Sequence, residues 1–149
     1  MDIFYNFPLF AALISNVLAQ VCKVFIHYLL NRSWKWSLLI STGGLPSSHS
    51  ATVASLTVAI GIVEGFSSPI FTVSFIFSVI VMYDAAGIRR HAGKQAVVLN
   101  RLIKDLQFPS EGGEDRILKE LLGHKPVEVL LGAVFGLIVS ILLYWWMPS

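Results

Sequence analysis

Long apolar segments, separated by short polar stretches, make up most of this chain. Four of them are candidate membrane-crossing helices, over residues Pro8–Leu30, Ser50–Val63, Pro69–Tyr83 and Val127–Trp146. A helix needs about 20 apolar residues to cross the hydrocarbon core of a bilayer. The first and fourth segments reach that length, whereas the second and third are marginal and have to tilt or pack behind the others. The pattern predicts an all-α polytopic membrane helical bundle of about four spans.

Residues 84–106 have a different pattern, in which apolar residues recur at helical spacing with basic residues between them. The apolar positions are Ile88, Ala92, Ala96, Leu99, Leu102, Ile103 and Leu106. This pattern is typical of an amphipathic helix. We expect it to continue from the third span on the cytoplasmic side, either into water or along the lipid headgroups. A polar loop over Pro109–Asp115 and a short amphipathic helix over Arg116–Leu122 are expected to follow.

The composition agrees with an integral membrane protein of a single domain, residues 1–149. Charged residues make up 13% of the chain and apolar residues 55%, whereas about a quarter of the residues of a soluble domain are charged. The formal net charge of +2 is too small to indicate a nucleic acid partner. The single cysteine, Cys22, excludes an internal disulfide and is expected to be a small core residue. No lysine or arginine precedes the first apolar segment, so no cleaved signal peptide is expected.

The basic residues predict the orientation of the chain. Arg32 and Lys35 lie between the first two spans. A larger group lies between the third and fourth: Arg89, Arg90, Lys94, Arg101, Lys104, Arg116, Lys119 and Lys125. Because cytoplasmic loops are rich in lysine and arginine, we expect both loops in the cytoplasm of a protein of the cell inner membrane. Four spans then bring the polar loop at 43–50, Asp84 and His124 to the cytoplasmic face.

The loop Gly43–Ser50 (Gly-Gly-Leu-Pro-Ser-Ser-His-Ser) carries the clearest candidate chemistry. Backbone N–H groups around Gly44 and Ser48, at a helix N-terminus, suit the oxygens of a phosphoryl group. His49 can move a proton as a general acid, although a histidine of a capping loop is the alternative. Ser47 is a candidate N-cap that supports the loop without a further role. These residues predict an integral membrane phosphatase, for which no cofactor is expected.

His124 and Glu128 are spaced i and i+4 at the start of the fourth span. On one helix face, the carboxylate can hold the imidazole in one tautomer and leave the other nitrogen free to attack phosphorus. Two structural alternatives remain open at this point. Glu128 can simply favour the positive end of the helix dipole, and His124 can be an interfacial residue that caps the helix.

Further polar residues are expected near this site. Asn16, Gln20, Lys23 and His27 share one face of the first span, which must look into protein or a wet cavity. Lys23 is placed to reach a phosphate or to snorkel toward the headgroups. At the end of the third span, Asp84 is expected to pair with Arg89 or Arg90, as a supporting group of the site or as a structural ion pair.

Three stretches of the chain resemble the divergent branch of the type-2 phosphatidic acid phosphatase and vanadium haloperoxidase-related proteins. They are Gly43–Ala51, Val81–Arg90 and Gly123–Val129, in the family's order, and the resemblance covers most of the chain from about Asn16. The resemblance implies a metal-independent phosphohistidine mechanism on a lipid-linked phosphate or diphosphate. By this resemblance, His49 is the acid, Ser48 takes the place of a glycine, His124 is the nucleophile and Glu128 replaces an orienting aspartate.

The chain also departs from the parent pattern. The parent's arginine six residues before the nucleophile is Leu118 here, and no Lys-x6-Arg-Pro element occurs. The cations that hold the phosphate must come from elsewhere, and Arg89, Arg90 and Lys23 are the candidates.

The leading prediction is a lipid phosphate phosphatase, with phosphatidylglycerophosphate or an isoprenoid diphosphate as substrate examples. The alternatives are a non-enzymatic lipid-binding or assembly protein that retains the fold, and a metal-dependent hydrolase using Asp84, Glu128 and histidines. A small-residue face on the second span would allow a helix of a second copy to approach, which leaves a homodimer open.

Overall fold

The computed structural model describes residues 6–40, 44–105 and 125–147, without the side chains of residues 88–90, 92 and 104. These residues form five α-helices and a short 3-10 helix, and no strand. They are α1 (Phe7–Asn31), η2 (Trp36–Ile40), α2 (Ser48–Glu64), α3 (Pro69–Ala86), α4 (Ile88–Asp105) and α5 (Pro126–Trp146). The all-α membrane architecture is therefore confirmed.

Local sequence signals explain where the helices begin and end. Asn6, Ser47 and Ser68 cap α1, α2 and α3, each accepting a hydrogen bond from the backbone N–H three residues later. Such caps satisfy amide groups that have no partner within the helix. The amphipathic helix expected over 84–106 is α4, but it begins only after a break at Gly87 (φ −105°, ψ −80°), and Asp84 still belongs to α3. The predicted loop Pro109–Asp115 and helix Arg116–Leu122 lie outside the described residues.

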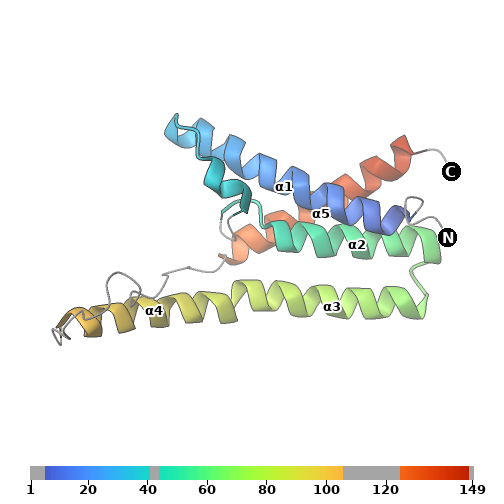
Figure 1. The fold of residues 1–149 in the computed structure, drawn as a ribbon. Helices are drawn as coiled ribbons and strands as arrows, with labels where there is room; N and C mark the ends of the chain where they lie inside the picture. Colours follow the sequence, from blue (N-terminus) through green and yellow to red (C-terminus); the bar gives the residue numbers. More distant parts are fainter. Residues whose placement is uncertain (1–5, 41–43, 106–124, 148–149) are drawn as a thin grey trace.

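The shortest of the apolar helices, α2, lies at the centre of the bundle. It packs against α1, α3 and α5 (Figure 1). Among the described residues, three helices are long and apolar enough to cross a membrane, α1, α3 and α5, while α2 has only 17 residues. The second segment is thus shorter than a typical span and packs behind its neighbours, as its marginal length indicated.

Small residues let α2 and α5 approach until their backbones nearly touch. A Cβ atom added at Gly132 would clash with the Ser47 carbonyl oxygen, and one at Gly136 would clash with that of Ala51. The Ser15 hydroxyl of α1 donates to the same Ala51 carbonyl oxygen (3.1 Å). Close approach of small residues is the usual way for membrane helices to pack. It fixes the start of α2 against the start of α5.

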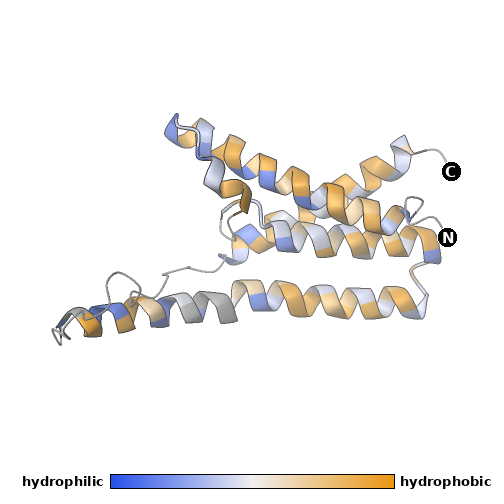
Figure 2. Cartoon of the chain, in the orientation of Figure 1, coloured by the Kyte–Doolittle hydropathy of each residue, from blue (hydrophilic) through white to orange (hydrophobic). Residues whose placement is uncertain are grey.

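Hydroxyl groups join α2 to α3. Thr57 Oγ1 lies 2.9 Å from Ser74 Oγ and 2.6 Å from Ser78 Oγ, and the Ser78 hydroxyl donates to the Val53 carbonyl oxygen (3.0 Å). All three hydroxyl side chains are buried. The outer face of α3 is apolar and exposed, as expected for a lipid-facing surface (Figure 2).

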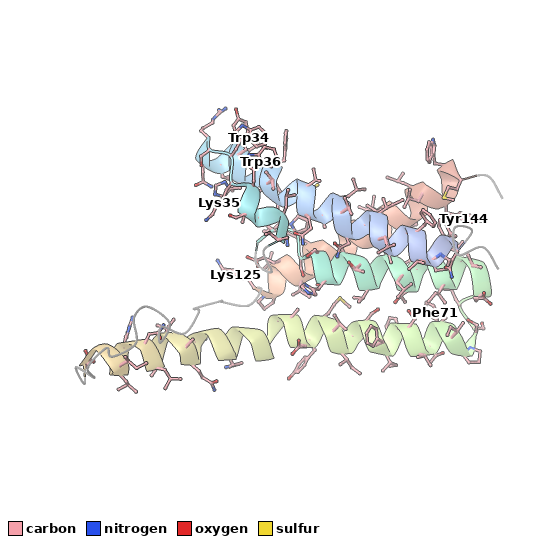
Figure 3. The ribbon with its side chains drawn as sticks, in the orientation of Figure 1. Trp34, Lys35, Trp36, Phe71, Lys125 and Tyr144 are labelled. Carbon is pink, nitrogen blue, oxygen red and sulfur yellow. The ribbon has the colours of Figure 1, made fainter. Side chains whose placement is uncertain are left out.

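Aromatic residues mark the two ends of the bundle. Trp34 stacks on Tyr28 (ring centroids 4.2 Å apart) and on Trp36 (5.5 Å) beyond the C-terminal end of α1. At the opposite end, Trp145 and Trp146 are 84% and 81% exposed. Figure 3 shows Trp34 and Trp36 at one end of the molecule and Tyr144, next in the chain to Trp145, at the other. Tryptophans at both ends are typical of a membrane protein anchored at its two interfaces.

Candidate functional site at the start of α2

The C-terminal part of α1 and the start of α2 meet at a buried lysine. Lys23 is only 2% exposed, and its Nζ donates a hydrogen bond to Ser48 Oγ over 3.2 Å. Ser48 is the first residue of α2 and is itself buried. A buried ammonium is costly unless polar or charged partners surround it. Lys23 therefore points into protein, as the polar face of the first span predicted, rather than snorkelling to the headgroups.

The loop before α2 lies directly over the stem of this lysine. Gly44 has φ +97°, a left-handed conformation that glycine adopts without strain. A Cβ atom at Gly44 would lie 3.7 Å from Lys23 Cδ. The glycine thus sets the chain turn that brings the Pro-Ser-Ser-His sequence to the lysine. Gly43 lies outside the described residues.

Ser47 ties the same loop to the beginning of α5. Its side-chain oxygen accepts hydrogen bonds from the backbone N–H and the hydroxyl of Ser50 (3.4 and 3.0 Å). Its backbone N–H donates to the Glu128 carbonyl oxygen over 3.1 Å. The capping role predicted for Ser47 is confirmed, and the residue also fixes the loop against α5.

The Glu128 carboxylate lies in the first turn of α5. Its Oε2 accepts a hydrogen bond from the Lys125 backbone N–H (3.1 Å). Its negative charge attracts the Lys23 ammonium. A carboxylate at this position satisfies an exposed amide and interacts well with the positive end of the helix. The structural role considered for Glu128 is therefore present. Its pairing with His124 stays a prediction, because α5 begins only at Pro126 and His124 lies outside the described residues.

Three helix ends converge on this region. The end of α3 and the starts of α2 and α5 lie at the same end of the bundle (Figure 1). His49, next to Ser48, is half-buried, and Asp84 is half-buried in the last turn of α3. The side chains of Arg89 and Arg90 are not described, so their part in holding phosphate and their pairing with Asp84 stay predictions.

The polar face of α1 continues from Lys23 toward the middle of the bundle. Asn16 Nδ2 donates to Thr52 Oγ1 (2.8 Å), and the Thr52 hydroxyl donates to the Ser48 carbonyl oxygen (2.7 Å). Gln20 Oε1 is buried and accepts no hydrogen bond within the described part of the chain. Polar side chains of α1 and α2 thus form a line that leads to the lysine.

Two contributors to this site were missed in the sequence. Thr52 bonds the Ser48 carbonyl oxygen, but a threonine inside an apolar helix gives no local sign of this role. Gly132 allows α5 to contact the Ser47 backbone. The spacing Gly132-x3-Gly136 is a known signal for close helix packing in membranes and could have indicated this contact.

Metal ligation was one of the alternatives considered for the acidic and histidine residues. Within residues 6–40, 44–105 and 125–147, no group of three or more histidine, cysteine, aspartate or glutamate side chains could hold a metal ion.

Comparison with known proteins defines the class to which this fold and this loop belong. Residues 4–139 match the family described as the divergent PAP2 family, and the chain belongs to that family. It is 44% identical over 153 residues to the uncharacterized membrane protein YuiD of Bacillus subtilis (strain 168), covering 96% of this chain and 97% of that protein. No solved structure gives a significant match. The resemblance seen in the sequence is confirmed at the level of the family and of a membrane protein.

Proposed function

We propose that this protein is a membrane lipid phosphatase. The phosphate group of its lipid substrate binds where Lys23 meets the start of α2. The observation that carries the proposal is the bond from a fully buried ammonium to Ser48, at the N-terminus of a helix. An ammonium and a helix N-terminus directed at one point are the two features that an anionic phosphoryl group needs. Membership of the divergent PAP2 family supports phosphatase chemistry.

The chemistry follows the phosphohistidine route. A ring nitrogen of His124 attacks phosphorus, the bond from phosphorus to the lipid oxygen breaks, and His49 donates its proton to that oxygen. Water then attacks the phosphohistidine, His49 takes back a proton, and inorganic phosphate and free His124 are released. Lys23 stabilises the negative charge on the phosphoryl oxygens, together with Arg89 and Arg90.

Lys23 also replaces phosphate-binding cations that the parent family's motifs supply and that this chain lacks. Leu118 stands where that pattern has an arginine, and the Lys-x6-Arg-Pro element is missing. Lys23 lies on α1 and brings its charge to the Pro-Ser-Ser-His loop. Lys23 thus supplies one phosphate-binding cation next to the predicted acid, His49.

The substrate is a lipid made on the cytoplasmic face, such as phosphatidylglycerophosphate or an isoprenoid diphosphate. From the positive-inside rule we infer that the Lys23 end of the bundle faces the cytoplasm, on the inner side of the cell inner membrane. Arg32, Lys35 and Lys125 all belong to this end, where Trp34, Lys35 and Trp36 lie at the end of α1 and Lys125 at the start of α5 (Figure 3).

The main competing function is lipid binding without turnover. It is favoured by the tight enclosure of Lys23, a residue that is 2% exposed and whose ammonium is already bonded to Ser48. In that case the polar line of α1 and α2 would serve helix packing, and a phosphate lipid would bind without being hydrolysed.

Phosphate release decides between these functions. Purified protein in detergent is incubated with phosphatidylglycerophosphate, phosphatidic acid and an isoprenoid diphosphate, each in the presence of EDTA. We expect turnover of at least one lipid, and its loss in His124→Ala and Lys23→Met. Lys35→Met, which removes an exposed lysine of the same end, is the matched control and should retain activity.

Absence of turnover on every lipid, with a folded wild-type protein that binds them, would support the non-enzymatic function instead. Turnover that EDTA abolishes would overturn the phosphohistidine route and favour metal-dependent hydrolysis. Thermal unfolding of each variant, measured in parallel, separates loss of chemistry from loss of structure.

A further inference from the structure

Helix α4 presents an exposed apolar strip. Val98, Leu99 and Leu102 are 56%, 47% and 49% exposed. Because successive residues turn by about 100° around a helix, these three side chains lie within roughly one third of its circumference. Of the other helices that the structure describes, α4 packs against α3, which precedes it. Figure 1 shows α4 extending well beyond the end of the bundle. The apolar strip is therefore left to be buried against something outside the described fold.

The charge of α4 shows what kind of cover suits it. The sequence Ile88–Asp105 contains five lysines and arginines and one aspartate, a net charge of +4, while the whole chain carries only +2. Lys94 and Arg101 are exposed and seven residues apart, so they lie on the same side of the helix, at one edge of the strip. Apolar side chains bordered by lysine and arginine are the pattern of a helix that binds a membrane surface.

The same charge disfavours a second copy of the chain as the cover. Two α4 helices packed strip to strip would bring two +4 segments together, and like charges in close contact repel. The cytoplasmic leaflet carries anionic lipids, which attract lysine and arginine residues near the surface. Charge complementarity therefore selects an anionic lipid surface.

Gly87 lies between α3 and α4, where the chain has to turn if α4 is to lie along a lipid surface. The helix α3 has 18 residues, about 27 Å, which is close to the thickness of the hydrocarbon core. The chain leaves helical geometry at Gly87, where that length ends. Glycine adopts a wide range of backbone angles. In the structure α4 continues close to the line of α3 (Figure 1), so a change of direction at Gly87 is the step that would bring α4 to the level of the headgroups.

We propose that α4 lies along the cytoplasmic headgroups and binds anionic lipid through Val98, Leu99 and Leu102 together with Lys94 and Arg101. This role is separate from phosphatase chemistry and would hold for a non-enzymatic protein as well. Only the full chain in a bilayer tests it, because α4 is anchored by α3.

The test measures how deeply a spin label on the strip enters the bilayer. The full-length Cys22→Ala/Leu102→Cys protein is labelled and placed in nanodiscs of phosphatidylcholine alone or with phosphatidylglycerol. Accessibility to oxygen reports lipid, and accessibility to a water-soluble nickel chelate reports water. We expect several-fold lower nickel accessibility in the anionic discs. Adding Lys94→Gln/Arg101→Gln should abolish that difference, whereas Arg32→Gln/Lys35→Gln, which removes the same charge elsewhere, should preserve it.

Two results would overturn the proposal. The first is a label that stays exposed to nickel in both kinds of disc, which would show that the strip does not enter the headgroup region. The second is dipolar broadening between labels in discs that contain two chains, which would make a second copy the cover of α4. Neither result depends on turnover, so failure of the phosphatase proposal leaves this test unaffected.

Discussion

The ammonium of Lys23, in α1, donates a hydrogen bond to the hydroxyl of Ser48, the first residue of α2, over 3.2 Å. The two residues are 25 positions apart in the chain. Through Ser47, the same loop is bonded to the Glu128 carbonyl oxygen at the start of α5. One loop thus joins three helices around a buried positive charge. This arrangement is the basis of the proposed site, and it gives the following predictions.

Replacing Lys23 with methionine should separate function from stability. Lys23→Met removes the ammonium but keeps an unbranched side chain of similar length. Because taking an ammonium out of water costs several kcal/mol, which its bond to Ser48 only partly offsets, we expect thermal stability to be retained or increased. Phosphate release should fall by about 100-fold or more, because a preorganised charge at the phosphoryl group is lost. Activity within about threefold of wild type, in a folded variant, would exclude Lys23 from phosphate binding.

Two substitutions at Glu128 should distinguish its helix-capping role from a role in catalysis. Glu128→Gln keeps an oxygen that accepts from the Lys125 N–H but removes the charge, so stability should change little. Glu128→Ala loses the cap as well and should cost about 1 kcal/mol in addition. We expect phosphate release to fall strongly in both variants. Full activity of Glu128→Gln would instead restrict Glu128 to capping α5. Thermal unfolding and initial rates are measured on the same samples.

Adding one carbon at Gly132 should push α5 away from α2. The new Cβ atom would clash with the Ser47 carbonyl oxygen, and only a shift of the backbone can relieve that clash. Gly132→Ala is expected to cost about 1–3 kcal/mol, as overpacking usually does, and to reduce activity by displacing the loop. Val134→Ile, which adds one carbon on an exposed position of the same helix, is the control and should be neutral in the same thermal unfolding measurement.

The hydroxyl of Thr57 should contribute to the docking of α3. Thr57→Val keeps the shape of the side chain but removes its contacts with Ser74 and Ser78. Hydrogen bonds between membrane helices contribute about 0.6 kcal/mol on average and up to about 1.7. Because several contacts meet at this oxygen, we expect a loss in the upper part of that range, measured by unfolding in mixed detergent.

The matched control for this substitution is Thr72→Val, at an exposed position of α3. Its hydroxyl contacts only the Ser68 carbonyl oxygen, at 3.4 Å, among the hydrogen bonds described here. Equal losses from the two substitutions would mean that the Thr57 cluster makes no special contribution to helix docking.

The sequence by itself determined the class of protein and the extent of its first and last helices. The first apolar segment, expected over Pro8–Leu30, is the helix Phe7–Asn31, and the last, expected over Val127–Trp146, is Pro126–Trp146. These features depend on residues close together in the chain, namely apolar runs, caps and prolines. The loop before α2 was also found locally, because its glycine, proline and serines stand out between apolar segments.

The tertiary structure decided which of several candidate cations reaches that loop. Nothing near Lys23 in the sequence distinguishes a lysine that bonds Ser48 from one that extends to the headgroups. Its position depends on how far α1 slides along α2, and that register is set by small-residue contacts such as Ser15 with Ala51. The capping of α5 by Glu128 likewise depends on the helix beginning at Pro126. Contacts between distant segments come from packing of the whole bundle, so no local pattern of residues specifies them.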